Sequence, residues 1–182
     1  APEPSPAAAD SPPAAAAAPP PAPLPAPTPT IAASSTPLPF SLLLSSCRDK
    51  ANAAAALPQF RRAGVSPHIV RTAVKGKGEW WRVMSGSYGS TEEAVQAKKA
   101  LGFNDAVVVR TPFAALIGEY PSEKAAADAA AHASAKGVFP YFIPRPAGAV
   151  GLVAGAYLTQ AEAESLQREL KTQGVATKIV RR

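Results

Sequence analysis

The 182-residue sequence has few of the side chains on which catalytic and metal sites depend, since it holds one cysteine and two histidines. Cys47, His68 and His132 show no spacing typical of a metal site or of a nucleophile paired with a base. A single cysteine also excludes an intramolecular disulfide. We therefore expect no catalytic residues, no metal and no cofactor. We interpret both histidines as surface or hydrogen-bonded structural residues and Cys47 as a small buried hydrophobe.

The sequence also lacks a long hydrophobic run. Its longest uninterrupted apolar stretch, residues 147–158, is shorter than the ~18 to 20 residues that a membrane-spanning helix needs. We expect no membrane span within this chain. Because the chain begins with Ala1, we expect any signal peptide or anchor to have been removed or to lie outside it.

Lysine and arginine are absent from residues 1–39, where 14 of the 21 prolines lie among long tracts of alanine. Such a segment cannot bury enough apolar surface to offset the entropy of ordering. We therefore predict a disordered Pro/Ala-rich linker over residues 1–39, biased toward polyproline II. Residues 40–182 hold all 19 basic residues and 11 of the 13 acidic ones, a net charge of +8. This charge favours an anionic partner, although an ordinary basic surface would show it too.

The remainder of the chain contains an internal repeat. Residues 64–70 match residues 137–143 at an offset of 73, and Gly-Ser-Tyr at 86–88 matches Gly-Ala-Tyr at 155–157. The sequence therefore predicts a linker, residues 1–39, followed by two copies of one unit, residues 40–111 and 112–182.

Each copy has the same predicted order of elements. The expected strands are residues 40–46, 67–73, 80–85 and 106–110 in the first copy and 113–118, 140–143, 149–154 and 178–181 in the second. The first helix of each copy, residues 49–64 and 122–137, ends at glycine, and Pro58 should kink or break the earlier one. The second helix opens with a capping box, Ser90 to Glu93 or Thr159 to Glu162.

Strand, helix, strand, strand, helix, strand is the split βαβ arrangement of ferredoxin-like and RNP-like folds. The sequence thus predicts an α+β protein with two four-stranded antiparallel sheets, each with both helices on one face and the other face open. Because a unit of about 70 residues buries little surface alone, we expect the two copies to pack against each other.

The third strand of the first copy carries the best candidate for binding. Side chains alternate along a strand, so Trp81 and Val83 share one face, which we predict to be core, while Trp80, Arg82 and Met84 share the other. An indole stacks on the face of a sugar ring, and a guanidinium donates hydrogen bonds to its oxygens. Two alternatives remain: Trp80 packs on the neighbouring copy, or the face stacks RNA bases, although the aromatic RNP1 string is absent.

These residues together resemble the SPOR family of peptidoglycan-binding domains. The resemblance lies in Phe-Ser-Leu-Leu-Leu-Ser-Ser-Cys at 40–47, the Ala-rich helix up to Gly64, and Trp-Arg-Val-Met-Ser-Gly-Ser-Tyr-Gly-Ser-Thr-Glu-Glu-Ala at 81–94. It covers residues 40–110 well and residues 113–182 more faintly. It implies a βαββαβ fold whose open sheet face binds glycan strands lacking stem peptides, which are enriched at bacterial division sites. It also implies a non-catalytic module on a Pro-rich periplasmic tether that targets an envelope protein to those sites, anchored by a segment outside this chain.

The resemblance places the glycan-binding positions of the first copy at Leu43, Ser46, Trp80 and Arg82. Leu43 stands where the family has glutamine, so an amide that would hydrogen-bond a sugar is missing. Strict alternation would put Ser46 on the helix side with Leu42 and Leu44, so its role requires a bulge or a strand end.

The corresponding positions of the second copy are Leu116, Glu119, Ala149 and Gly151, which include neither an indole nor a guanidinium. Residues 149–154 are apolar on both faces, as in strands that are covered on both sides. We therefore expect the sheet face of the second copy to be buried, by the first copy or by a partner, and not to bind glycan.

The leading hypothesis is a cell-wall-binding module whose partner is denuded glycan, with envelope or division proteins as further partners. The second is a protein-interaction or scaffold module of the envelope in which the glycan site has decayed. RNA binding through the basic sheet face is a weaker third hypothesis, and no nucleic-acid partner is expected.

Overall fold

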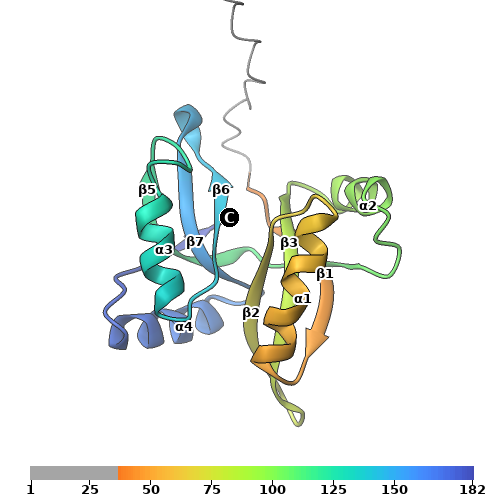
Figure 1. Ribbon diagram of the computed structural model, residues 1–182, viewed down its shortest axis with the longest axis horizontal. Coiled ribbons are helices and arrows are strands. Elements are labelled where there is room, and N and C mark those ends of the chain that lie inside the picture. Colours follow the sequence, from red (N-terminus) through yellow and green to blue (C-terminus); the bar gives the residue numbers. More distant parts are fainter. Residues whose placement is uncertain (1–36) are drawn as a thin grey trace, which may run out of the picture. The chain divides into compact units, whose positions relative to one another are not determined.

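The computed structural model describes residues 37–182 (Figure 1). The predicted linker, residues 1–39, lies outside the described residues except for its last three. The first unit, residues 40–110, contains β1 (Phe40–Cys47), α1 (Lys50–Arg62), β2 (Pro67–Val74), β3 (Gly78–Tyr88), α2 (Thr91–Ala100) and β4 (Val107–Arg110). The second unit, residues 113–181, contains β5 (Phe113–Tyr120), α3 (Ala127–Ala135), β6 (Pro140–Pro144), η1 (Pro146–Gly148), β7 (Val150–Tyr157), α4 (Gln160–Thr172) and β8 (Lys178–Arg181).

Each unit forms one four-stranded sheet, in the order β2-β3-β1-β4 in the first and β6-β7-β5-β8 in the second. All six pairs of neighbouring strands are antiparallel. The predicted α+β fold with two four-stranded antiparallel sheets is therefore confirmed for residues 37–182.

Both helices of the first unit cover the same face of its sheet. Leu57 of α1 is buried in a cluster with Ile69 and Val83, and Ala94 of α2 is buried against Leu42. In Figure 1, α1 lies across the strands of the first sheet. The prediction that Trp81 and Val83 belong to the core is correct, because both pack in the α1 cluster; Tyr88 packs with the α2 cluster.

The helices of the second unit are arranged in the same way. Ala133 of α3 and Leu170 of α4 are buried in one cluster with Ala115 and Ala154 of the sheet. Removal of these apolar surfaces from water stabilises the unit by roughly 25 cal/mol per Å² buried. The helices of both units therefore leave the opposite sheet face to other contacts.

A β-bulge in β1 decides which of its side chains share a face. Leu43 pairs with Met84, but the next pair joins Ser45 to Val83, so Leu44 is the extra residue. The bulge reverses the alternation and brings Leu43 and Ser46 to the same face. The second unit repeats the irregularity between its corresponding strands, β5 and β7. The binding role predicted for Ser46 needed a bulge or a strand end, and the bulge is present.

The repeated Gly-x-Tyr sequence also has a structural cause. Gly86 has φ +74°, and a Cβ at this position would overlap the ring of Tyr88, which folds back over the glycine. Gly155 has φ +70° and meets Tyr157 in the same way. Only glycine combines this left-handed conformation with so close an aromatic ring.

Three expectations about the helices differ from the structure. Pro58 does not break α1, because it lies on the exposed side of the helix, where the carbonyl that lost its partner can reach water. Helix α3 begins at Ala127 rather than near Ser122, because residues 123–126 form turns. The capping box is complete only at Thr159, since Glu93 bonds the backbone N–H of Gly89 instead of that of its own N-cap residue.

The face of the first sheet opposite its helices is only partly open, contrary to expectation. Val70 and Met84 on this face are buried in one cluster with Ala156 and Tyr157 of the second unit. His68 is also buried, and its ring stacks on Tyr141 at a centroid distance of 3.7 Å. The expectation that the two units pack together is therefore confirmed. Their contact covers part of the sheet face that also carries Trp80 and Arg82.

Arg182 joins the two units at the edge of this contact. Its backbone N–H donates to Pro112 O, and its side chain is 4% exposed. The guanidinium donates to the first unit and the connection through Ser41 Oγ at 2.9 Å, Gly86 O at 3.2 Å, Ser87 Oγ at 2.6 Å, Thr111 O at 3.2 Å and Thr111 Oγ1 at 2.8 Å.

Candidate functional site

The uncovered end of the first sheet carries a row of polar and aromatic side chains. Ser46 of β1 lies opposite Arg82 of β3, and Trp80 lies opposite Thr72 of β2. Cross-strand partners point to the same face, and so do residues two apart on one strand. Ser46, Arg82 and Trp80 therefore share the face opposite the helices, with Ser46 exposed and the other two half-buried.

The sequence analysis did not identify a fourth member of this row, Arg48. Its Cζ lies 4.5 Å from the centroid of the Trp80 ring, which is a cation–π contact, and Nη1 donates to Lys77 O at 3.2 Å. Arg48 follows Ser46 by two residues, so the alternation that places Ser46 on this face also places Arg48 there. That spacing is the signal that could have revealed it.

The charged group of Arg82 is available to a ligand, whereas the indole N–H of Trp80 is buried. Trp80 Nε1 is buried and has no hydrogen-bond partner among residues 37–182. Within the same range Arg82 forms no ion pair. A buried N–H without a partner is unfavourable, but this one lies below the surface and does not itself reach a ligand oxygen. The row can therefore offer an aromatic face, hydrogen-bond donors and positive charge to one ligand.

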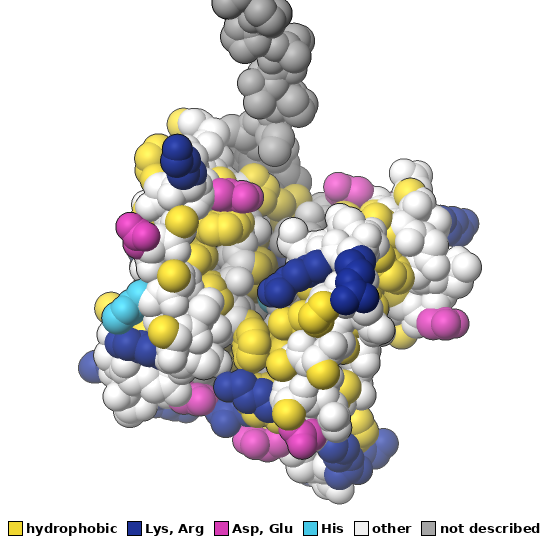
Figure 2. All heavy atoms as spheres, viewed as in Figure 1, with side chains coloured by type: hydrophobic (Ala, Val, Ile, Leu, Met, Phe, Trp, Pro, Cys, Tyr) yellow, Lys and Arg dark blue, Asp and Glu magenta, His cyan; other side chains and the backbone are white. Residues whose placement is uncertain are grey.

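Positive charge extends along the edge of this row. Figure 2 shows Lys and Arg side chains gathered at the end of the first unit that carries the β2–β3 turn. Lys75 and Lys77 in and beside that turn are exposed. The surroundings of the row therefore attract anionic ligands.

Residues 39–110 match the SPOR domain model. The match spans the whole first unit, from β1 to β4. SPOR domains are non-catalytic modules that bind peptidoglycan, and they usually occur in cell-division proteins of the periplasm and envelope. No curated protein and no solved structure matches the chain.

Leu43, the fourth predicted glycan-binding position, is placed differently from the other three. It lies opposite Met84, on the far side of the bulge from Ser46. It packs against the cluster that contains Met84 and Tyr157, at the contact with the second unit. The structure therefore brings Ser46, Trp80 and Arg82 together and places Leu43 in the contact between units.

The second unit fills the positions that correspond to the row of Ser46, Trp80 and Arg82 with its own side chains. Arg145 crosses over Gly151, where a Cβ would lie 2.9 Å from its Nε, and it forms an ion pair with Glu119 at 3.2 Å. Leu116 lies beside the same glycine, while Ala149 precedes β7. No indole is present in this arrangement, and the one guanidinium is paired.

The sheet face of the second unit is buried, as expected. Tyr141, Ile143 and Val153 on this face are at most 8% exposed. Tyr141 also donates a hydrogen bond to Gly155 O at 2.8 Å and stacks on His68 of the first unit. The first unit thus contributes to covering this face.

His68 contradicts the expectation of a surface or hydrogen-bonded histidine. It is buried, and neither ring nitrogen has a hydrogen-bond partner among the described residues. Burial, and secondarily the positive charge of Arg182, lower the pKa of His68 well below its usual value of 6.5. The imidazole is therefore neutral at neutral pH and serves the contact between units.

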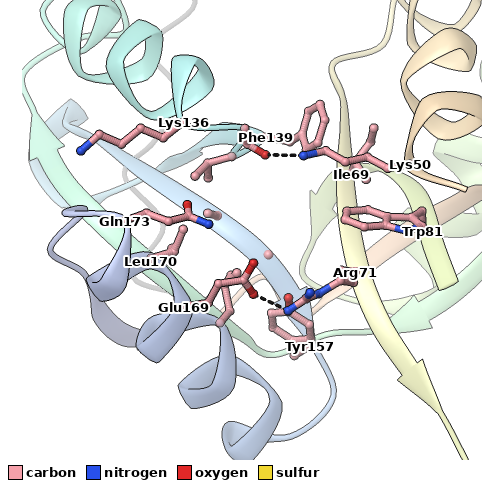
Figure 3. A pocket seen from close by; sticks show the side chains of 15 residues that line it. Lys50, Ile69, Arg71, Trp81, Lys136, Phe139, Tyr157, Glu169, Leu170 and Gln173 are labelled. Atoms are coloured by element: carbon pink, nitrogen blue, oxygen red, sulfur yellow. Dashed lines mark hydrogen bonds and ion pairs between the residues drawn. The ribbon is translucent and has the colours of Figure 1, made fainter. Parts of the chain in front are cut away.

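A small cavity, of about 90 Å³, lies apart from this row, between β2 and α4 (Figure 3). Trp81 and Leu170 contribute apolar walls, while the cationic side chains at its rim are already engaged. Lys50 donates to Gly137 O at 3.1 Å, and Arg71 forms an ion pair with Glu169. This cavity therefore offers a ligand little free charge, and Trp81 has a packing role there.

The described residues offer neither a metal site nor a membrane span. Residues 37–182 contain no group of three or more His, Cys, Asp or Glu side chains suited to hold a metal ion. In that same range, every helix is too short or too polar to cross a bilayer.

Proposed function

We propose that the chain is a non-catalytic module that binds glycan strands lacking stem peptides through the row Ser46, Arg48, Trp80 and Arg82. The observation that carries this proposal is the row itself, at the uncovered end of a sheet in the segment that matches the SPOR domain. Trp80 and the Arg48 guanidinium that stacks on it supply a flat surface for a sugar ring, and the hydroxyl and the guanidinium groups supply hydrogen bonds to its oxygens.

The preference for denuded glycan follows from space and charge. The second unit stands against the same sheet face and buries Val70 and Met84, so a stem peptide on a sugar beside Arg82 would meet this wall. Removal of the peptide by an amidase leaves a carboxylate on the sugar, which suits the net charge of +8 of residues 40–182. Denuded strands therefore fit the site better than peptide-bearing ones.

The module would then target a larger envelope protein to the division site. Denuded glycan is enriched where a bacterium divides its wall, and residues 1–39 have the composition of an extended tether. In this proposal the chain acts in the periplasm, and an anchor outside residues 1–182 holds it at the envelope.

Co-sedimentation with cell-wall sacculi tests the proposal. Binding should rise after an amidase has stripped the stem peptides, and it should fall about tenfold in Trp80→Ala and Arg82→Ala, since a hydrogen bond to a charged group contributes ~1.5–3 kcal/mol. Arg62→Ala is the matched control, because Arg62 carries the same charge in the last turn of α1 on the other face of the sheet. Equal binding of all three variants would refute the proposed site.

A second candidate function is a scaffold module of the envelope without glycan binding. The packing of Leu43 in the contact between units favours it, because this position then serves assembly rather than a ligand. Absence of sedimentation with both intact and stripped sacculi would favour this function. Sedimentation that instead follows added RNA and is lost in modest salt would favour RNA binding.

A further inference from the structure

A crevice of about 530 Å³ lies between the first sheet and the junction of β7 with α4. This volume is within the range of ~300–1,000 Å³ typical of ligand sites. Thr72 and Arg82 line it from the sheet, Arg110 lines it from the end of β4, and Tyr157, Leu158 and Glu162 line it from the second unit. Arg82 belongs both to this crevice and to the row with Trp80, so the two are continuous.

The free charge of the crevice is positive. Lys75, Arg82 and Arg110 line it, and Glu162 is its one lining carboxylate among the described residues. The Glu162 carboxylate already accepts hydrogen bonds from the backbone N–H of Thr159 at 3.1 Å and from its hydroxyl at 2.8 Å. Within the described part of the chain these three cations have no such partner, so a ligand with carboxylate and hydroxyl groups suits the crevice.

The crevice also has an apolar wall that lies in contact with solvent. Leu158, between β7 and α4, is 56% exposed, and it is one of two exposed large hydrophobic residues among residues 37–182. The other, Val107 of β4, is 55% exposed and does not line the crevice. Apolar side chains next to hydrogen-bonding cations match the two kinds of surface that a sugar chain presents.

We propose that the second unit completes the glycan site, and that the crevice holds the sugars that follow the one stacked on Trp80. This inference rests on the proposed glycan binding of the first unit. The second unit, which has no binding row of its own, thereby contributes Tyr157 and Leu158 as a wall of the shared site. Ligands long enough to reach the crevice bind more tightly than a single disaccharide.

Calorimetric titration of residues 1–182 with denuded disaccharide and tetrasaccharide tests this arrangement. Leu158→Asp places a negative charge on the crevice wall at an exposed position and should weaken tetrasaccharide binding about tenfold without changing disaccharide binding. Arg110→Ala should show the same pattern with a smaller loss, of about threefold to fivefold. Val107→Asp is the matched control, because it makes the same change at equal exposure outside the crevice.

The outcomes separate this inference from the proposed function. If Trp80→Ala abolishes binding of both ligands while Leu158→Asp and Arg110→Ala bind the tetrasaccharide as the unmodified chain does, glycan binding stands and the crevice is not part of the site. If Val107→Asp weakens binding and Leu158→Asp does not, the strand follows β4 instead, and the crevice is not part of the site. If neither ligand binds the unmodified chain, the proposed function itself fails.

Discussion

Replacement of Arg182 by alanine should loosen the contact between the two units. Arg182 is 4% exposed, and the four N–H groups of Nη1 and Nη2 donate to five acceptors in the first unit and the connection, so that one N–H is shared. Ser41 is fully buried and Thr111 is 5% exposed. In Arg182→Ala these hydroxyls lose their charged donor and remain shielded from water.

Two opposing effects determine how much Arg182→Ala lowers the free energy of unfolding. Hydrogen bonds contribute about 1 kcal/mol each net of water, so the loss of the four donating N–H groups would destabilise the fold by about 4 kcal/mol. Among the described residues Arg182 has no carboxylate partner, and removal of a buried, unpaired charge recovers part of that loss. We expect the free energy of unfolding to fall by about 2–4 kcal/mol, which lowers Tm by on the order of 10 °C.

Urea and thermal unfolding followed by circular dichroism measure this change. Arg181→Ala is the matched control, since the Arg181 side chain is exposed and its Cζ lies 5.5 Å from the centroid of the Phe113 ring; it should cost under about 1 kcal/mol. If Arg182→Ala and Arg181→Ala unfold within 0.5 kcal/mol of each other, on the order of experimental error, the hydrogen bonds of Arg182 do not hold the units together.

Two further predictions concern the fold. Gly86→Ala should destabilise the first unit by about 2–4 kcal/mol, since the new Cβ meets both a positive φ and the ring of Tyr88, while Gly102→Ala, at φ +73° with open space, should cost only ~1–2 kcal/mol; equal losses in urea unfolding would contradict the role of the ring. The pKa of His68 is lowered on folding, so the unfolded chain takes up a proton first as the pH falls. Stability should therefore decrease below about pH 6.5, by up to ~1.4 kcal/mol per pH unit. His68→Phe should flatten this slope and exposed His132→Ala should not, and an unchanged slope in His68→Phe would rule out His68 as its source.

The sequence predicted the repeated order of elements well, because hydrophobic periodicity and glycine positions are local signals. The match of residues 64–70 to residues 137–143 indicates the second unit by sequence similarity alone, without an assignment of its strands. The alternation of β3 correctly separated Trp81 from Trp80. The requirement for a bulge near Ser46 was also inferred, from the conflict between alternation and the expected role of that residue.

The sequence could not show how the two units meet, because that contact joins residues far apart in the chain. Met84 was placed on an open face, yet Tyr157 of the second unit covers it. Arg145 fills the second unit's site through a contact with Glu119 that no local pattern indicates. Arg48 was missed for a simpler reason, since it lies just beyond the end of β1, where the strand pattern was not extended.

The short connection between the units has a consequence for protein engineering. Thr111 N donates to Pro39 O at 2.6 Å, and Arg182 N donates to the neighbouring Pro112 O at 2.9 Å. Residues 39 and 182 therefore lie on either side of the same two-residue connection, close enough for a short loop to join them. Circular permutants that open at an exposed turn such as Lys75–Gly78 would then keep both sheets, and the pair of units could be inserted as a single cassette into a surface loop of another protein.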